Sequence, residues 1–323
     1  MHSSRVTARM VETERVACTL CGRDDTRFLF MGWDRRHGVP GEFPVVQCKN
    51  CGLIYPNPRP APATINQYYP DEYEPYIGLS AKPNQGKTIR EYGFRKRCRL
   101  VVAYKPGGRL LDVGTATGDF LHAMAAQGEW ELYGVEPNEK AALIARTYPE
   151  LQISVGTLDD VAYPPNYFDV ITLWDVLEHL PDPRATLLEI RRIIKYDGVL
   201  IFQVPNLASW EARIFGFRWV GWDVPRHLHL LTSEVLGQLL DVTGFKPIGS
   251  SCPGGGYDTF FESLSLWLRE TRWHRSGQGI QRLRYSLLAR AIAWPLFELA
   301  RRLKRSPAMV VVASPVAGSE HTR

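Results

Sequence analysis

The amino-acid sequence predicts an α/β fold built on a doubly wound, mostly parallel seven-stranded sheet. From Arg109 onward, short apolar runs alternate with longer segments whose apolar residues recur at helical spacing. Such alternation predicts helices on both faces of a parallel sheet, with a ligand site at the carboxyl ends of the strands. Upstream of this region, four cysteines in two close pairs indicate a separate small module.

The composition sets the scale of the molecule. With 323 residues, of which 45% are hydrophobic and 23% charged, the chain can bury the core of one large domain or two smaller ones. Residues 1–15 are polar and lack the apolar core of a secretory signal, so we expect a cytoplasmic protein with a disordered N-terminus. The apolar stretch 287–300 includes Arg290, Pro295 and Glu298 and is too short for an ordinary membrane-spanning helix.

Residues 16–60 carry two Cys-x-x-Cys knuckles. Their thiols belong to Cys18, Cys21, Cys48 and Cys51. Cytosolic chains rarely form disulfides and paired knuckles suit tetrahedral zinc, so we expect a zinc ribbon with short strands near 28–31 and 45–47. Four cysteines complete the zinc shell and leave no open position for catalysis. We therefore expect a structural or substrate-docking role, with a redox dithiol or a metal-free module as the alternative.

Residues 61–105 form the expected linker and helical lead-in to the large domain. Tyrosines cluster in this segment at Tyr68, Tyr69, Tyr73 and Tyr76. We expect their rings either to cover a substrate pocket or to pack between domains. The basic segment 87–105 is typical of a helix with a solvated positive face, which commonly binds nothing in particular.

The large domain is expected to span residues 106–316. We expect its strands near 109–113, 131–135, 152–155, 168–173, 198–203, 246–250 and 309–313. Helices are expected near 118–127, 138–147, 183–195 and 232–243. The last two strands should pair antiparallel with a helical insertion at 254–306 between them, and residues 317–323 should form a tail.

The loop after the first strand of this domain is suited to bind a ligand. Gly114 and Gly118 permit positive φ and lack the Cβ that would block close contact, and the helix that follows offers free N–H groups. The second strand ends about twenty residues later at Glu136, whose carboxylate can accept both hydroxyls of a ribose. The glycine spacing is not GxGxxG, so a pyrophosphate cradle is not favoured.

These residues resemble the class I S-adenosylmethionine-dependent methyltransferases. The resemblance rests on three motifs in order: Leu111-Asp112-Val113-Gly114-x-x-x-Gly118, then Gly134-Val135-Glu136-Pro137, then Phe168-Asp169-Val170-Ile171-Thr172-Leu173-Trp174-Asp175-Val176-Leu177-Glu178-His179-Leu180. It implies the Rossmann-like methyltransferase fold and S-adenosylmethionine as the cofactor. One departure is Ala116, where many relatives carry a glycine, and its methyl group should narrow the loop without closing it.

The resemblance also implies which residues hold the cofactor. The loop after the first strand would face the methionine and ribose, and Glu136 would hold the ribose hydroxyls. Residues after the third strand would lie by the adenine, and those that end the fourth would border the methionyl group. The implied cofactor-binding residues are Asp112, Gly114, Thr115, Ala116, Gly118, Glu136, Leu158, Asp159, Trp174 and Asp175.

The ribbon and linker resemble a subset of this family that includes sugar C-methyltransferases and methyltransferases of saccharide-assembly clusters. The shared features are the cysteine ribbon, the tyrosine-rich stretch and the run Gly52-Leu53-x-Tyr55-x-Asn57-Pro58-Arg59-Pro60. This resemblance covers nearly all of residues 16–250. The sugar C-methyltransferases carry a further carboxy-terminal domain, whereas this sequence ends soon after its expected last strand. Methyl transfer to oxygen, nitrogen or carbon is therefore open.

Methyl transfer to oxygen or to an acidic carbon benefits from a general base. The sulfonium leaving group is already good, so the protein supplies mainly proximity, alignment and desolvation. His227 and His229 follow the fifth strand, where the fold places a loop over the acceptor, and the resembling sugar methyltransferases use a histidine near this place. We expect His227 to be the base, with His229 as the second candidate and hydrogen-bonded packing as the alternative. For His179, structural and functional roles are both open.

The insertion before the last strand is basic and amphipathic. Residues 269–305 contain ten Arg or Lys against two Glu, whereas the whole chain has a net charge of only +5. Basic helices that carry tryptophan and aliphatic residues on another face are typical of membrane interfaces. Peripheral membrane contact through residues 257–305 is therefore one expectation, and a lid over the sheet or a dimer face is the alternative.

We expect a cytoplasmic enzyme, at the inner face of the membrane if the insertion binds lipid. Its acceptor would be a saccharide or a small metabolite, with a lipid-linked molecule as one option, in the biosynthesis of cell-surface polysaccharide or of natural products. The alternatives are an RNA methyltransferase with a zinc ribbon that docks the substrate, and a non-catalytic scaffold that binds the cofactor. Nucleic acid is not favoured, because the excess cations are interleaved with residues typical of helix cores. The sequence does not indicate an oligomeric state.

Overall fold

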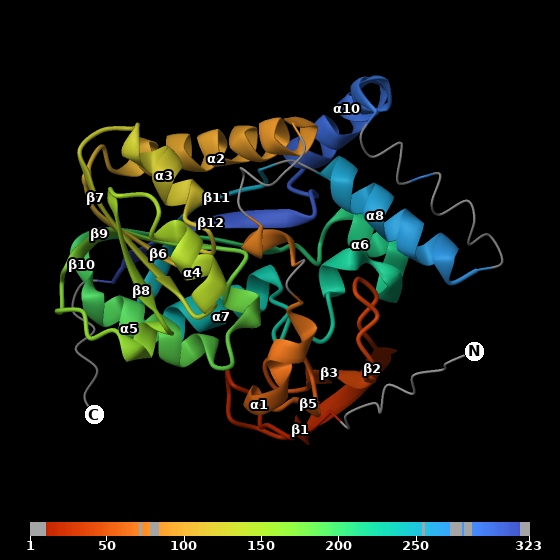
Figure 1. Cartoon of the computed structure of the whole chain (residues 1–323). Coiled ribbons are helices and arrows are strands. Elements are labelled where there is room, and N and C mark those ends of the chain that lie inside the picture. The colour runs from red at the N-terminus through yellow and green to blue at the C-terminus, as the bar shows by residue number, and fades with distance from the viewer. Residues whose placement is uncertain are drawn as a thin grey trace, which may run out of the picture.

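The computed structural model confirms the predicted α/β fold and describes residues 11–70, 73–77, 84–253, 256–271, 280 and 286–316. Seven strands form one sheet in the order β11-β12-β10-β9-β6-β7-β8 (Figure 1). They span Gly108–Val113 (β6), Trp130–Glu136 (β7), Leu151–Val155 (β8), Phe168–Trp174 (β9), Ile194–Pro205 (β10), Phe245–Ser251 (β11) and Ala308–Pro315 (β12). Strands β6 to β10 pair parallel, and β12 lies antiparallel between β10 and β11.

Helices cover both faces of the sheet because successive strand residues point to opposite sides. On one face, Leu110 and Val170 pack with α2 (Asn84–Tyr104) and α3 (Asp119–Ala125). On the other face, Leu111 and Ile171 pack with α5 (Pro183–Ile193) and α7 (Ser233–Val242). Helix α4 (Glu139–Ala145) lies beside β7 and β8. The four helices expected between and after these strands are all present.

The helix starts follow from local sequence. Asp182 accepts a hydrogen bond from the Ala185 N–H at the start of α5, with proline at the first helical position. Thr232 caps α7 in the same way by accepting from the Val235 N–H. Gly244 then ends this segment at a positive φ of 76°, which carries the chain into β11.

The N-terminal ribbon, residues 16–60, is a three-stranded antiparallel sheet of β2 (Thr26–Gly32), β3 (Phe43–Cys48) and β4 (Ile54–Pro56). A second, two-stranded sheet joins β1 (Thr13–Glu14) to β5 (Arg59–Pro60). Of the N-terminus expected to be disordered, residues 1–10 lie outside the described residues. The expectation is wrong for Thr13 and Glu14, because they pair with β5.

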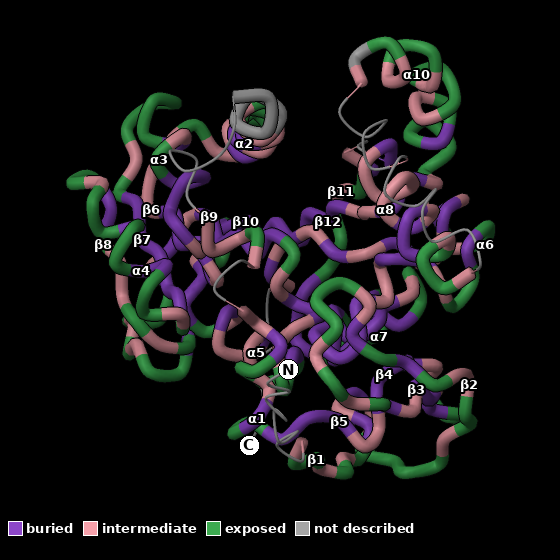
Figure 2. Tube along the Cα trace, turned by 45° about the vertical axis from the view of Figure 1, so that its right-hand side comes forward, coloured by how far each residue is buried: buried purple, intermediate pink, exposed green. Residues whose placement is uncertain are grey.

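The ribbon and the large domain share one hydrophobic core. Leu53 and Tyr55 of the ribbon pack in the same cluster as Leu231 and Val235 of the large domain. The Leu230 N–H also donates to the Ile54 carbonyl at 2.8 Å, which forms an isolated β-bridge. Figure 2 shows the ribbon below the sheet, with buried segments facing the large domain.

Short helices connect these parts, and sequence periodicity did not indicate most of them. The linker contains α1 (Pro62–Ile65), η1 (Asn66–Tyr68) and η2 (Glu74–Tyr76). Two turns, η4 (Leu158–Asp160) and η5 (Leu177–His179), follow β8 and β9. After β10 come α6 (Trp210–Phe215), η6 (Gly216–Arg218) and η7 (Val220–Trp222).

The insertion before β12 is helical, as predicted. It contains α8 (Gly256–Arg269) and α10 (Leu287–Arg302), which lie beside one another at one end of the molecule (Figures 1 and 2). The expected tail at 317–323 lies outside the described residues. Among the helices that the structure describes, none combines the length and the apolar character that crossing a membrane requires.

Candidate active site

The loop after β6 brings its backbone close to the neighbouring strands. Gly114 and Gly118 have φ of 72° and 75°, in the left-handed region that favours glycine. A Cβ at Gly114 would lie 2.7 Å from Val176 Cγ2, and one at Gly118 would lie 2.9 Å from Ala145 Cβ. Both positions therefore require glycine for space as well as for conformation. Ala116, the departure from the usual glycine, also has a positive φ, of 50°.

Glu136 ends β7 with its carboxylate directed at this loop. Its two oxygens accept hydrogen bonds of 2.8 Å from the Ala116 and Asn138 N–H groups. The side chain is buried, and burial raises its pKa although the two amides oppose that shift. A carboxylate has about four acceptor positions, so acceptor capacity remains for further hydroxyl donors.

Asp112 has a different environment from the rest of the loop. It is fully buried and accepts a 2.6 Å hydrogen bond from Thr172 Oγ1, so it ties β6 to β9. Burial raises its pKa to about 7, against the effect of the Thr172 hydrogen bond. Thr115 is also buried, and its N–H donates to the Val135 carbonyl at 3.1 Å. Both residues hold the shape of the loop.

The remaining residues of the expected cofactor set lie at the carboxyl ends of β8 and β9. Leu158 is buried, whereas Asp159 is exposed beside it in η4. Trp174 is buried with its ring centre 5.4 Å from that of Phe120. Asp175 is exposed and has a positive φ of 59°. Because the parallel strands end at one edge of the sheet, the structure brings the whole expected set to that edge.

Arg97 of α2 also reaches this edge. Its guanidinium lies 4.7 Å from the Trp174 ring centre and donates to Asp175 Oδ2 at 3.0 Å. The Gln203 amide donates to both oxygens of Asp175 at 2.7 and 2.8 Å. The sequence alone predicts for Arg97 only a place on a solvated basic face. The crossing of α2 over the strand ends was the missing information.

His227 is buried beside Glu178, a residue of the turn that follows β9. Its Nδ1 is 2.9 Å from the Gly221 carbonyl, and its ring centre is 4.6 Å from that of His179. Its Nε2 is 3.9 Å from Glu178 Oε1 and 4.0 Å from Asp223 Oδ2. Burial lowers the pKa of His227 to about 4, although the Asp223 carboxylate acts in the opposite direction.

His229 is directed at the ribbon instead. Its Nε2 is 2.9 Å from the hydroxyl of Thr19, which lies within the first cysteine knuckle. Burial lowers its pKa to about 3, so it packs as a neutral ring. The structure therefore does not bring His229 together with His227 and His179. His229 is instead buried and hydrogen-bonded in the packing between the ribbon and the large domain.

Tyrosines of the linker cover the histidine pair. The Tyr69 hydroxyl is 3.0 Å from His179 Nδ1, which also lies 3.1 Å from the Arg226 carbonyl. The Tyr73 ring centre is 5.1 Å from those of both Tyr69 and Tyr76. Burial and then the Glu136 carboxylate raise the pKa of Tyr76 to about 12, so its hydroxyl stays protonated. The tyrosine rings extend from the histidines toward Glu136, at the carboxyl end of β7.

Glu178 was not selected from the sequence, although it lies within the third motif. It is 1% exposed, and its carboxylate oxygens have no hydrogen-bond partner among the described residues. Burial, and next the Asp175 charge, raise its pKa well above the usual value. Its carbonyl accepts from the Leu228 and His229 N–H groups at 2.8 and 3.0 Å, which fixes the segment that carries His227.

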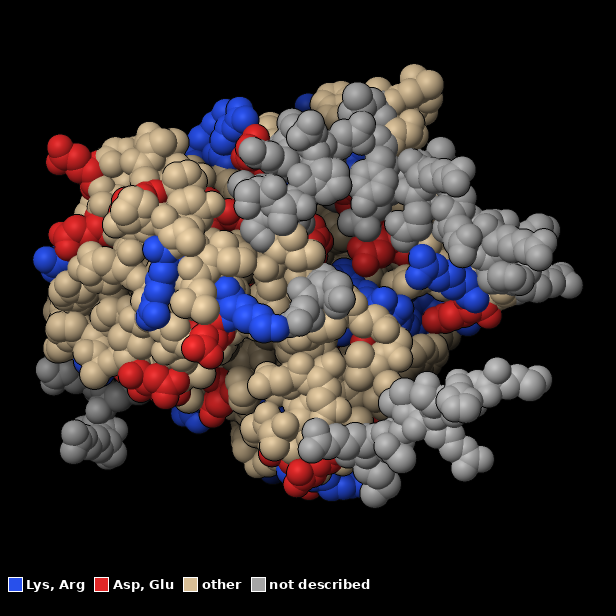
Figure 3. Space-filling view, in the orientation of Figure 1, with Lys and Arg blue, Asp and Glu red and all other residues tan. Residues whose placement is uncertain are grey.

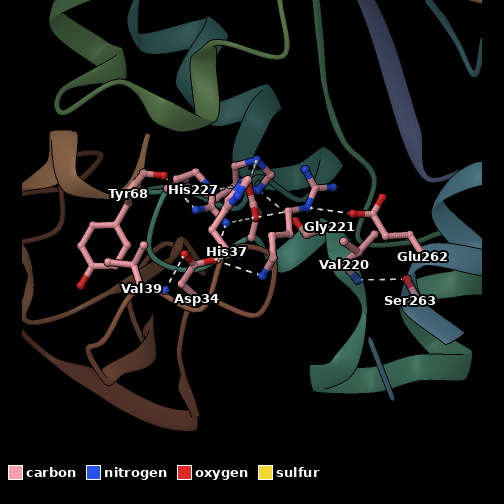
Figure 4. A network of polar contacts seen from close by, with 12 residues as sticks. Asp34, His37, Val39, Tyr68, Val220, Gly221, His227, Glu262 and Ser263 are labelled. Carbon is pink, nitrogen blue, oxygen red and sulfur yellow. Dashed lines mark hydrogen bonds and ion pairs between the residues drawn. The ribbon is translucent and has the colours of Figure 1, made fainter. Parts of the chain in front are cut away.

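A buried ionic network holds the His227 segment against the ribbon and α8 (Figure 4). Arg226 is fully buried and donates to Asp34 at 2.8 Å, to Asp223 at 2.7 and 3.0 Å and to the Tyr68 carbonyl at 2.9 Å. Burial alone would raise the pKa of Asp223, but the charges of Arg36 and Arg226 outweigh it and hold that pKa well below its usual value.

The same network reaches two further elements. Arg36 of the ribbon lies 3.5 Å from Asp223 and 3.2 Å from Glu262 of α8. Asp34 accepts from the backbone N–H groups of Arg36, His37 and Val39 at 3.1 to 3.2 Å, so the ribbon loop is folded around it. The ribbon thus supplies two of the charges that hold the His227 segment.

The four cysteines of the ribbon come together. All four sulfur atoms lie within 4.8 Å of one another, those of Cys18, Cys21, Cys48 and Cys51. The Cys18–Cys51 and Cys21–Cys48 sulfurs are 3.4 and 3.6 Å apart, close to the roughly 3.8 Å edge of a tetrahedron around zinc. Gly22 and Gly52 follow the knuckles at positive φ. The cluster therefore fits a zinc ribbon.

Comparison with known proteins gives this site a context. The family model for the methyltransferase domain matches residues 88–249. The ubiquinone biosynthesis O-methyltransferase of Yersinia enterocolitica is 31% identical over 141 residues, which cover 40% of this chain and 58% of the relative. That of Thiobacillus denitrificans is 30% identical over 143 residues, which cover 41% and 61%. The chain thus spans about three fifths of the length of these curated relatives.

A solved structure supports the fold alone. One chain of the complex between the Haloferax volcanii Trm112 methyltransferase activator and a methyltransferase matches with a TM-score of 0.50. The match covers 73% of this chain and 94% of the other, at 16% sequence identity.

Proposed function

The chain belongs to the methyltransferase-domain family and is a class I S-adenosylmethionine-dependent methyltransferase, and from this premise we propose that it methylates a hydroxyl oxygen with His227 as the general base. The acceptor is a saccharide or another small hydroxyl-bearing metabolite. Transfer to oxygen is supported by the curated relatives, which are O-methyltransferases. The observation that carries the proposal is the geometry of His227, a buried neutral imidazole beside the edge that fits the cofactor.

The residues at the strand edge fit S-adenosylmethionine. When bound, this cofactor supplies a methyl group on a sulfonium, whose leaving group needs no acid. Glu136 is fixed by two backbone amides and retains acceptor capacity for the ribose hydroxyls. The glycine positions 114 and 118 let the loop backbone approach a ligand. Asp159 would lie by the adenine, and Trp174 and Asp175 would border the methionyl group.

His227 is held in the tautomer that a base requires. The Gly221 carbonyl accepts from Nδ1–H, which leaves the lone pair on Nε2. The lowered pKa keeps the ring neutral at pH 7. With S-adenosylmethionine bound, Nε2 would take the proton of the acceptor hydroxyl, whose oxygen would receive the methyl group that the sulfonium releases. The products are the methylated acceptor, S-adenosylhomocysteine and a proton on His227.

The Asp223 carboxylate stabilises the charge that His227 acquires, whereas the raised pKa of Glu178 disfavours the ionised form of that side chain. Glu178 and Asp223 lie 3.9 and 4.0 Å from His227 Nε2. Asp223 stays ionised because Arg36 and Arg226 lower its pKa. Opposite charges at this distance in a buried site attract strongly, so the imidazolium is stabilised where it forms. Tyr69 and Tyr73 cover the pair of histidines and keep water away from it.

The ribbon is proposed to bind one zinc ion through Cys18, Cys21, Cys48 and Cys51. Four thiolates close the coordination shell, so the metal would stabilise the ribbon and take no part in methyl transfer. Its consequence for the site is indirect. The ribbon carries Asp34 and Arg36, whose contacts hold the His227 segment in place.

The RNA alternative has less support among the described residues. Arg226 is fully buried between two carboxylates, and Arg36 is paired with Asp223 and Glu262. Cations held in this way do not form the continuous exposed face that phosphate tracking requires. A small acceptor held in the covered site is therefore the function we propose.

The test uses S-adenosylmethionine with a tritiated methyl group and a panel of nucleotide sugars, phenols and catechols. Wild-type protein should transfer label to at least one hydroxyl acceptor. His227→Ala should lower kcat by roughly 10²–10⁴-fold, the usual contribution of a general base, without loss of cofactor binding. His229→Ala is the matched control and should retain kcat. Equal loss in both variants, or unchanged kcat in His227→Ala, would exclude His227 as the base.

A further inference from the structure

Helix α10 packs on the molecule through only one of its faces. The Phe297 ring centre lies 5.8 Å from that of Tyr257 and 6.0 Å from that of Phe260, both on α8. Ala300 of α10 is also buried, and the Arg290 guanidinium lies over the Tyr257 ring at 4.6 Å. In Figure 2 the helix stands at the edge of the molecule, and much of its trace is exposed.

A stripe of large aliphatic side chains runs along a different face of α10. It consists of Leu288, Ile292, Leu296, Leu299 and the C-cap residue Leu303, which are 48–73% exposed. Their spacing of three and four residues places them within an arc of about 80° around the helix axis. Trp294 is also 62% exposed on this helix. In Figure 3, the visible surface over α10 is largely tan, the colour of uncharged residues.

Such a surface is unusual for a protein that meets only water. Single exposed leucines are common, whereas a continuous stripe of them marks a site that contacts something apolar. Helix α10 has a side-chain N-cap, since Ser286 accepts from the Ala289 N–H at 3.3 Å. We refer to the five aliphatic residues as the α10 stripe.

Cations accompany the α10 stripe. Arg301 and Arg302 lie in the last turn and Lys304 and Arg305 follow, whereas Glu298 is the only acidic residue within the helix. The sequence between α8 and α10 adds arginines at 272, 275, 282 and 284 and one acidic residue, Glu270, which pairs with Arg35 of the ribbon at 3.0 Å. The rest of the chain outside 269–305 carries a net negative charge, so the excess positive charge is concentrated in this segment of the sequence.

We propose that the α10 stripe docks on an anionic phospholipid surface, with the aliphatic residues at the acyl boundary and the cations among the headgroups. An apolar face with flanking Lys and Arg is the pattern of a helix that lies in a membrane interface. A second copy of this chain fits the stripe less well, because pairing two such helices would bring together two segments of the same charge. This docking goes beyond methyl transfer and does not depend on which acceptor is used.

The test measures co-sedimentation of the zinc-loaded full chain with phosphatidylcholine vesicles that contain or lack phosphatidylglycerol. Binding should require phosphatidylglycerol at roughly 0.1 M salt. It should weaken as salt rises to roughly 1 M, where the Debye length falls from about 10 Å to about 3 Å. No binding to either vesicle, or equal binding to both, would overturn the proposal.

Matched variants separate the stripe from general surface effects. Leu296→Asp should weaken binding by at least about tenfold, since a buried leucine contributes roughly that much or more. Leu143→Asp on α4 is the control, because both leucines are 55% exposed. Arg302→Gln should weaken binding about fivefold, the effect of one cation near an anionic surface. Arg95→Gln on α2 is its control, because the Arg302 side chain is 70% exposed and the Arg95 side chain 63%.

Other occupants would give different results. Self-association without lipid that Leu296→Asp abolishes would assign the stripe to a dimer and overturn the membrane proposal. Equal losses in Leu296→Asp and Leu143→Asp would also contradict it. Circular dichroism and binding of S-adenosylmethionine should be unchanged in all four variants. A failure of lipid binding with intact methyl transfer would therefore leave the proposed function standing.

Discussion

Replacing Arg226 with methionine should destabilise the protein strongly, although methionine fills most of the same volume. The guanidinium makes four hydrogen bonds, two to Asp223 and one each to Asp34 and the Tyr68 carbonyl. Without it, the buried carboxylates of Asp34 and Asp223 lose the cation that is hydrogen-bonded to both of them. Removal of one partner from a buried ion pair costs about 3–5 kcal/mol, against a typical total stability of about 5–15 kcal/mol.

The dependence on pH follows from the lowered pKa of Asp223. The pKa of the Asp223 carboxylate is lower in the folded protein than its unfolded value of about 3.9. The ionised carboxylate therefore stabilises the folded protein above about pH 3.9, and this stabilisation is lost as pH falls toward the folded pKa. The difference in unfolding free energy between wild type and Arg226→Met should therefore be largest near neutral pH. It should shrink when the protein is acidified below about pH 4, because protonation removes the charge that Arg226 compensates.

Urea denaturation of zinc-loaded protein, followed by tryptophan fluorescence at several pH values, measures this difference. Arg95→Met is the control, because Arg95 is exposed and its replacement should change stability by less than about 0.5 kcal/mol. An Arg226→Met variant within about 0.5 kcal/mol of wild type at neutral pH would refute the reasoning. So would a difference that grows on acidification.

Two further predictions concern the base and the metal. If His227 takes the proton, kcat/KM should be flat from about pH 6 to pH 8 and fall only as pH approaches about 4, because the base must be neutral. A midpoint of this pH profile near the ordinary histidine value of about 6.5 would contradict the prediction. Purified protein should contain about one zinc per chain, as four thiolates bind, and Cys48→Ser should lose it together with stability. A fully stable, metal-free wild-type protein would exclude the zinc ribbon.

Local sequence determined the sheet of this protein well. The apolar runs at 109–113 and 131–135 are bounded by glycine and charge, so each strand can be located without knowledge of its neighbours. Glu136 and the glycine loop follow from the same reasoning, because parallel strands end at one edge wherever the helices lie. The cysteine knuckles are equally local, since each ligand pair is set by a short turn.

The long-range contacts of the site could not be inferred in that way. Asp34 and Arg226 are 192 residues apart in sequence, and nothing in either segment indicates that they form a buried pair. Arg97 was indistinguishable from its basic neighbours until α2 was seen to cross the strand ends. Tyr69 and His179 meet for the same reason, through the path of the linker over the sheet.

The two histidines of the segment after β10 show a similar limit. His227 and His229 flank Leu228, and both occupy the position where the fold places a loop over the acceptor. Only the structure separates them, since the ribbon covers His229 through Thr19 whereas His227 lies beside His179 and Glu178. The burial of Glu178 likewise depends on residues 226–229, whose backbone packs against it.

Calorimetric titration of wild-type protein and Glu136→Ala with S-adenosylmethionine and S-adenosylhomocysteine tests the assigned cofactor site most directly. Wild type should bind both ligands. Glu136→Ala should lose about 1–3 kcal/mol, or roughly 5- to 150-fold in affinity, because the ribose hydroxyls lose their acceptor. Unchanged affinity in a folded Glu136→Ala variant would mean that the cofactor lies elsewhere, and the assignment of the strand edge, with His227 beside it, would fail.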